Sequence, residues 1–238
     1  MGNGCGLLQE TAADGDSLRQ RRRSFPPAPG IPVTFRAAGT SLSGQAITDS
    51  VLIVAGKNWE KYSVGENAET ITLQPGIIGQ RVNEILAPYG RTFTPDPASK
   101  KSAMVGGIVM NNASGMNCGT HANSDRMLLS ARLILADGTI LDTGDEESRK
   151  SFLHSHPSFI SRIEQLRDKV NADPSLVERI RYKYGIKNVT GLNLLPLVRF
   201  TDPFDIITHL LVGSEGTLAF GSQFTMRTGH LYPQSASA

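Results

Sequence analysis

The chain has 238 residues, 39% of them hydrophobic, and its 24 Lys and Arg residues nearly balance 22 Asp and Glu residues. That length and apolar content suffice for one or two compact units with hydrophobic cores. Because four of the arginines crowd into residues 19–23, the remaining charge leaves no basic face for nucleic acid. The composition therefore predicts a soluble protein without a nucleic-acid partner.

The cysteines and histidines argue against a metal site. Cys5 and Cys118 are the only cysteines of the sequence, half of the four thiolates that an iron-sulfur cluster normally requires. The five histidines show no convincing ligand spacing. No apolar run approaches the roughly 18 residues of a membrane span, and residues 1–10 lack the features of a signal peptide. We expect no metal, no membrane span, and a reducing, cytoplasmic location.

Residues 1–30 are rich in Gly, Arg and Pro without any apolar period, which predicts a disordered leader. Beyond it, β-branched and aromatic runs predict strands, and apolar residues at helical spacing predict helices. The predicted strands begin at Ile31 and span 51–54, 69–74, 128–135 and, after an Asp137-Gly138 turn, 140–141. The predicted helices span the apolar positions from 77 to 86, 158–171 with Ser158 as cap, 175–184 opened by Asp173-Pro174, and 203–210. Their irregular order favours an α+β fold over a doubly wound sheet.

The loop from Gly39 to Gly44 has the spacing of a phosphate-binding loop, because glycines let backbone N–H groups turn inward toward an anion. Gln45 and Ala46 stand where an ATPase needs Lys and Ser or Thr, so nucleoside-triphosphate chemistry is disfavoured. No G-x-G-x-x-G dinucleotide fingerprint follows a predicted strand. Taken alone, the loop fits a plain Gly-rich turn equally well.

Two later loops are also ambiguous when each is considered singly. Residues 111–115 (Asn-Asn-Ala-Ser-Gly) follow an apolar segment at 104–110. Their composition suits either a loop that contacts the polar edge of a ligand ring or the capped end of a helix. In residues 212–218, Glu215 lies between glycines, where a capping carboxylate is the alternative to a binding role. His209 stands in an apolar run and is expected to pack within a helix.

Four segments together resemble, in order, the FAD-binding signatures of the vanillyl-alcohol-oxidase flavoprotein superfamily. They are residues 35–45 (Phe-Arg-Ala-Ala-Gly-Thr-Ser-Leu-Ser-Gly-Gln), 95–99 (Pro-Asp-Pro-Ala-Ser), 105–115, and 212–218 (Val-Gly-Ser-Glu-Gly-Thr-Leu). The resemblance extends over about 31–228. Within it, residues 111–120, 135–143 and 182–191 look like the long bacterial D-lactate dehydrogenases that join an FAD domain to a C-terminal iron-sulfur domain.

The resemblance implies an FAD-binding domain of the PCMH type with two α+β subdomains, at about 31–92 and 93–228, followed at 229–238 by the start of a missing cap domain. The leader at 1–30 matches nothing in the family, and Thr94 and Leu192 depart from its pattern. The implied FAD-binding residues lie in short loops: Ala38, Gly39, Thr40, Ser41, Leu42, Ser43 and Gly44 around the diphosphate; Pro95, Asp96, Ser99, Gly106, Gly107, Asn111, Ser114 and Gly115 from the ribityl chain to the flavin ring; and Glu215, Gly216 and Thr217 near the adenosine half.

By the same resemblance, the chain is the FAD-binding portion of a 2-hydroxy-acid dehydrogenase, with D-lactate as the preferred substrate and hydride moving from its Cα to flavin N5. We expect noncovalent FAD, because residues 36–44 hold no His or Cys and Cys118 is the only nearby alternative. The family's iron-sulfur cluster falls in the missing C-terminal part, and a separate electron-acceptor subunit is a further hypothesis.

No catalytic base is assigned, because in the family the substrate-binding groups come largely from the missing cap. Lys187 faces either the substrate or, as an ordinary surface lysine, the solvent. The isolated chain is therefore expected not to oxidise D-lactate. The rival hypothesis is a truncated, non-catalytic remnant or an interaction domain.

Overall fold

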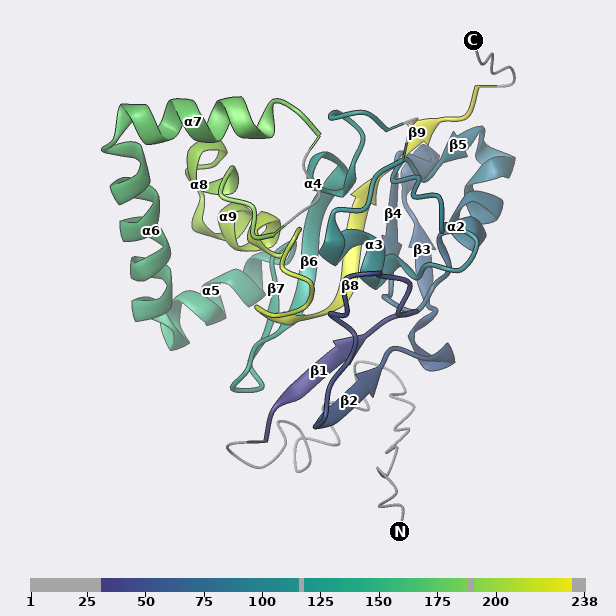
Figure 1. Cartoon of the computed structure of the whole chain (residues 1–238), viewed down its shortest axis with the longest axis horizontal. Coiled ribbons are helices and arrows are strands. Elements are labelled where there is room, and N and C mark those ends of the chain that lie inside the picture. The colour runs from purple at the N-terminus through teal and green to yellow at the C-terminus, as the bar shows by residue number, and fades with distance from the viewer. Residues whose placement is uncertain (1–30, 116–117, 188–190, 233–238) are drawn as a thin grey trace.

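The computed structural model describes residues 31–115, 118–187 and 191–232, so the predicted leader at 1–30 lies outside the described residues. At its centre is a five-stranded antiparallel sheet in the order β3-β4-β8-β6-β7 (Figure 1). These strands are β3 (Tyr62–Val64), β4 (Thr70–Leu73), β8 (Phe220–Arg227), β6 (Leu128–Ile134) and β7 (Ile140–Asp142). Two smaller sheets accompany it, a parallel pair of β1 (Val33–Arg36) with β2 (Val51–Val54) and an antiparallel pair of β5 (Arg91–Thr92) with β9 (Gly229–His230).

Helices lie on both sides of the central sheet. Helix α3 (Val105–Asn111) crosses in front of its middle strands, and α2 (Gly79–Leu86) lies beyond the edge strand β3 (Figure 1). A helical group gathers beyond β7 and consists of α5 (Glu146–Ser155), α6 (Pro157–Asn171), α7 (Pro174–Tyr184), α8 (Pro196–Arg199) and α9 (Pro203–Leu210). The short helix α4 (Ser124–Met127) leads directly into β6. This mixture of helices and antiparallel strands confirms the predicted α+β class.

Strand β8 is one of the elements that the sequence analysis did not predict, as are β3 and α5, although β8 pairs with both β4 and β6. Its first half, Phe220-Gly-Ser-Gln223, lacks the β-branched run that marks a strand. Burial nevertheless alternates along its second half, where Phe224 and Met226 are fully buried. Residues 220–227 therefore form a strand because they pair with neighbours on both edges and pack on one face. Their local strand propensity does not account for it.

Elements with strong local signals are confirmed. Residues 51–54 form β2, residues 203–210 form α9, and the Asp137-Gly138 turn joins β6 to β7. Asp173 caps α7 by accepting a hydrogen bond from the Leu176 backbone N–H at 3.0 Å. The predicted cap at Ser158 is wrong: α6 begins at Pro157, because α5 ends at residue 155 and leaves a single residue, His156, for the turn between them.

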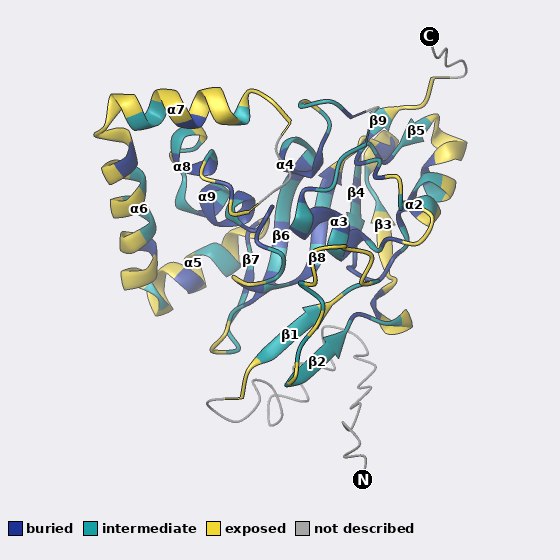
Figure 2. Cartoon of the chain, in the orientation of Figure 1, coloured by how far each residue is buried: buried dark blue, intermediate teal, exposed yellow. Residues whose placement is uncertain are grey.

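Two hydrophobic clusters stabilise the fold. The larger one lies between the central sheet and helices α2, α3, α5 and α9, and the smaller one joins α6 to α9 through Val170, Ile180, Leu197 and Ile206. Figure 2 shows buried residues concentrated on the sheet and α3, whereas α6 and α7 turn one face to solvent. As predicted, His209 packs within a helix, buried at 4% exposure on α9.

Aromatic rings connect the parallel pair to the central sheet. Phe35 of β1 stacks on Phe220 of β8 with ring centroids 4.8 Å apart, and buried Trp59 meets the same ring edge-on at 5.2 Å. No residue of β1 or β2 is fully buried. The division of the chain at residue 92 stays a prediction, although β3 and β4, which precede that boundary, share one sheet with β8 and β6.

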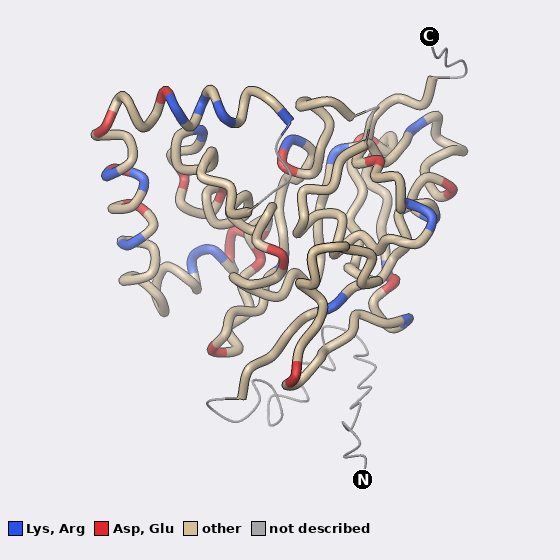
Figure 3. The backbone as a smooth tube through the Cα atoms, viewed as in Figure 1, with Lys and Arg blue, Asp and Glu red and all other residues tan. Residues whose placement is uncertain are grey.

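Charged residues of both signs are interspersed over the outer helices, and the central strands carry few (Figure 3). In the part of the chain that the structure describes, no helix combines the length and apolar character needed to cross a membrane. Likewise, the described residues contain no cluster of three or more His, Cys, Asp or Glu side chains suited to a metal ion.

The core assignment leads to a stability prediction. Leu133 of β6 is fully buried, whereas Leu153 of α5 is 43% exposed. Leu133→Ala should therefore lower the free energy of unfolding by about 2–5 kcal/mol, through lost burial and a residual cavity. Leu153→Ala should change it by about 0.5 kcal/mol or less. Urea unfolding followed by circular dichroism measures both, and equal losses would contradict the placement of β6 in the core.

Candidate functional site

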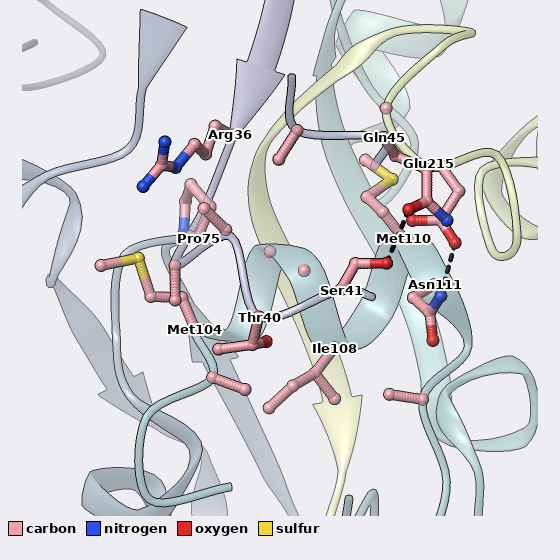
Figure 4. Close-up of a pocket in the computed structure, with 18 of the residues that line it drawn as sticks. Arg36, Thr40, Ser41, Gln45, Pro75, Met104, Ile108, Met110, Asn111 and Glu215 are labelled. Carbon is pink, nitrogen blue, oxygen red and sulfur yellow. Dashed lines mark hydrogen bonds between the residues drawn. The ribbon is translucent and has the colours of Figure 1, made fainter. Parts of the chain in front are cut away.

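A cavity of about 440 Å³ opens among the described residues, a size within the range of small-molecule sites. Three walls enclose it: the loop that follows β1, the face of helix α3, and the segment from Glu215 into β8 (Figure 4). The sequence brings these walls together only through long-range pairing, since α3 and residue 215 are about a hundred positions apart. The cavity is thus built at the junction of the β1–β2 pair and the central sheet.

Most of the predicted site residues meet at this cavity. The predicted residues that line it are Ala38, Gly39, Thr40, Ser41, Leu42, Ser99, Gly106, Gly107, Asn111, Ser114, Glu215 and Gly216. The predicted residues that do not line it are Ser43, Gly44, Pro95, Asp96, Gly115 and Thr217. Whether any of them contacts a cofactor stays a prediction.

Asp96 and Gly115 are the sequence neighbours of two residues that line the cavity, Pro97 and Ser114. Asp96 pairs with Lys100 at 2.6 Å. A side chain at Gly115 would collide with the Asp96 backbone carbonyl, so only glycine lets the two loops approach this closely. These two residues therefore shape the site without lining it.

The sequence analysis missed an apolar wall of the cavity. Met104 and Ile108, four residues apart, line the cavity from α3 and the residue before it. This helical spacing, continued by Asn111, is a signal that could have located them. Phe220 and Phe224 complete the wall, and they were missed because β8 itself was not predicted.

The loop after β1 is short, glycine-rich and nearly uncharged. Gly39 and Gly44 adopt left-handed backbone angles, with φ of 68° and 79°, which other residues rarely adopt. Between them, the Ser41 hydroxyl donates a hydrogen bond to Gln45 Oε1 at 2.6 Å. Such a loop presents small polar groups and backbone to the cavity, the arrangement that suits a phosphate group without a metal ion.

The two adjacent glycines of α3 have different roles. A Cβ on Gly106 would come within 2.7 Å of the Pro75 side chain, so this glycine lets the helix pack against residue 75. A Cβ on Gly107 would meet only Ala37, at an ordinary 3.5 Å. Gly107 therefore faces the cavity and the loop after β1, and its missing side chain leaves room there.

Ser114 offers an observation that points to a ligand. Its Oγ is buried, lines the cavity, and has no hydrogen-bond partner among the described residues. A buried hydroxyl without a partner costs free energy, about 1–3 kcal/mol. A polar group bound in the cavity would supply the missing partner.

Glu215 and Asn111, which both line the cavity, point toward each other (Figure 4). The Asn111 amide donates a short hydrogen bond to the Glu215 carboxylate. Burial raises the pKa of the Glu215 carboxyl above its usual value, although hydrogen bonds from Asn111 and Gln45 oppose that shift. The structure thus joins two side chains that the resemblance assigned to different halves of FAD, and which part of FAD each contacts stays a prediction.

Among the described residues that line the cavity, only Arg36, Lys187 and Glu215 are ionisable. Lys187 is largely exposed and also reaches the cavity, where its ammonium lies 3.4 Å from the Gly115 carbonyl oxygen. Lys187 is therefore a surface lysine that also lines the cavity. Whether it faces the substrate stays a prediction. Cys118, the alternative to noncovalent attachment, is fully buried, does not line the cavity, and hydrogen bonds to Gly115.

Comparison with known proteins agrees with this geometry. The family described as "FAD binding domain" matches residues 24–144, about half of the chain. The chain belongs to this family. Its FAD-binding signatures are those of the vanillyl-alcohol-oxidase type that the four loop segments resemble.

Relatives are similar in sequence beyond residue 144, and a solved structure shares the fold. A D-2-hydroxyglutarate dehydrogenase of Haemophilus influenzae is 24% identical over 227 residues, covering 90% of this chain and 21% of that protein. A D-lactate dehydrogenase of Archaeoglobus fulgidus is 26% identical over 205 residues, covering 86% of this chain and 34% of that protein. The 6-hydroxy-D-nicotine oxidase of Arthrobacter nicotinovorans shares the fold over 90% of this chain and 33% of its own, with a TM-score of 0.51 and 10% identity. The chain thus spans about a fifth to a third of the relatives it matches.

The two glycines of α3 lead to a prediction for this FAD-binding domain. Gly107→Val should fold but bind FAD more weakly, because a branched side chain would enter space that the cofactor needs. Overpacking of this kind costs about 1–3 kcal/mol, and each 1.4 kcal/mol raises Kd about tenfold. Gly107→Ala is the matched control, since its Cβ fits beside Ala37. Quenching of flavin fluorescence measures both affinities, and unchanged binding by the Val variant would mean that Gly107 does not face the cofactor.

Proposed function

We propose that the cavity binds FAD noncovalently, in the service of oxidising a 2-hydroxy acid. The observation that carries this proposal is the convergence of the predicted loop residues on one cavity that also holds the unpartnered Ser114 hydroxyl. The match to the FAD-binding family supports the same cofactor.

The residues present suit FAD. The neutral loop from Ala38 to Leu42 offers backbone groups and small hydroxyls for the diphosphate. Met104, Ile108 and Phe220 form an apolar surface on which a flat ring can pack. When bound, the flavin would accept a hydride from the substrate. The protein's share is to hold the ring, exclude water and orient the substrate.

The proposed substrate is a D-2-hydroxy acid. The relatives are named for D-2-hydroxyglutarate and D-lactate, and D-lactate remains our preferred substrate. Lys187 is the cation best placed for a substrate carboxylate, because its exposed ammonium also reaches the cavity beside Gly115. A cytoplasmic location and a separate electron-acceptor subunit complete the proposal.

The first test is binding itself. Purified chain mixed with FAD should take up one cofactor per molecule, and FMN should bind more weakly because it lacks the second phosphate and the adenosine. Acid precipitation should then leave the yellow colour in the supernatant, since no cysteine or histidine lines the described cavity. Colour in the pellet would contradict noncovalent binding, and no uptake of FAD would overturn the proposal.

The second test is turnover. Oxidation needs a base for the substrate hydroxyl proton, and the ionisable residues lining the described cavity are two cations and Glu215, whose carboxylate already accepts hydrogen bonds from two amides. FAD-loaded chain mixed anaerobically with D-lactate or D-2-hydroxyglutarate should therefore bleach more slowly than about 1 per second, the low end of ordinary enzymes. L-lactate is the control. Faster bleaching by either D-acid would show that the chain holds a complete catalytic site.

A further inference from the structure

Glu215 occupies a backbone conformation that favours glycine. Its φ is 55°, and the neighbouring Gly213 and Gly216 have φ of 93° and 79°. A residue with a Cβ is strained in this region, and such strain persists where the side chain or its surroundings compensate for it. A glycine at position 215 would relieve the strain, and a role of the Glu215 side chain would offset it.

The contacts of Glu215 join two walls of the cavity. Its backbone N–H and that of Gly213 both donate to the Met110 carbonyl oxygen, at 3.1 and 2.8 Å, which fixes this loop to the end of α3. Its carboxylate then accepts a hydrogen bond from Asn111 on α3. The Gln45 side chain, at the end of the loop after β1, is near enough to lower the pKa of the same carboxyl. Figure 4 shows the bond from Asn111 to Glu215, with Gln45 beside Glu215, so this one side chain lies between the helix and the loop.

The carboxylate also fixes which way the neighbouring polar groups point. An ionised carboxylate only accepts hydrogen bonds, so both amides must turn their N–H groups toward it. Gln45 is then left with its Oε1, which accepts the Ser41 hydroxyl at 2.6 Å. The Asn111 Oδ1 is likewise left free to accept a hydrogen bond from a donor elsewhere. A single negative charge therefore orients two amides and one hydroxyl at the cavity.

We infer that Glu215 is a positioning residue, whose carboxylate holds the loop at 38–45 against α3 in the shape that receives the cofactor. The inference rests on the proposed function, because the shape matters only if FAD binds there. The alternative is that Glu215 contacts the cofactor itself without ordering the loop. The two differ in what happens to the loop when FAD is absent.

The first experiment uses Glu215→Gly in the full chain. Because glycine fits the left-handed backbone, the unfolding midpoint should not fall, whereas FAD affinity should fall at least about tenfold. Without FAD, trypsin should cleave after the exposed Arg36 faster in this variant than in the wild type. Asn67→Gly is the matched control, since Asn67 also has a positive φ of 52° but does not line the cavity, and it should change neither FAD affinity nor cleavage.

The second experiment exchanges donor and acceptor. Asn111→Asp alone places two carboxylates in contact and should weaken FAD binding. Adding Glu215→Gln gives the new aspartate a donor and still leaves an acceptor for Gln45, so the double variant should recover at least about tenfold in affinity over Asn111→Asp.

The outcomes separate the two proposals. If the wild type does not bind FAD, the proposed function fails and the inference fails with it. If the wild type binds but Glu215→Gly binds equally well, only the positioning role is wrong. If Glu215→Gly loses affinity while trypsin cleavage without FAD is unchanged, or if the double variant recovers nothing, then Glu215 acts on the cofactor directly and the inference is overturned.

Discussion

The pairing of β8 on both of its edges is the interaction on which the rest of the structure depends. Strands β3 and β4 come from the first third of the chain and β6 and β7 from the middle, and β8 lies between them as the shared partner. The same strand carries Phe220, which anchors β1, and Phe224, which lines the cavity. The sheet and the cavity therefore both require β8, which follows their other strands and helices in the chain. Such non-local pairing is expected to make folding slow relative to a helical protein of this size.

An element of the fold could be predicted from the sequence where the residues that specify it lie close together in the chain. Helix α9 and the hairpin of β6 and β7 were found because cap, turn and apolar residues lie within a few positions of one another. Strand β8 was missed because its Gly221 and neighbouring polar residues resemble a loop, and its partners lie far away in sequence. The cap at Ser158 failed because the end of the preceding helix, and not the cap itself, set where α6 begins.

The candidate site also has a part that the sequence predicted and a part that it did not. The loop from Ala38 to Leu42 could be recognised from composition and resemblance, since glycines and small hydroxyls are contiguous there. The contact between Asn111 and Glu215 joins residues 104 positions apart, and no local pattern encodes it. Resemblance named both residues but assigned them to separate halves of the cofactor, because a motif records which loops matter and not how their side chains meet.

The weak burial of the β1–β2 pair bears on how the protein resists proteolysis. Two parallel strands without a buried residue are a marginal unit, and Phe35 ties them to the sheet through its contact with Phe220. A ligand that bridges the loop after β1 and helix α3 would add its binding free energy to this unit, about 2.7 kcal/mol at a free concentration of 100 times Kd. Under the proposed function, flavin supply would thus govern how often this corner opens, and with it how long each molecule survives proteolysis.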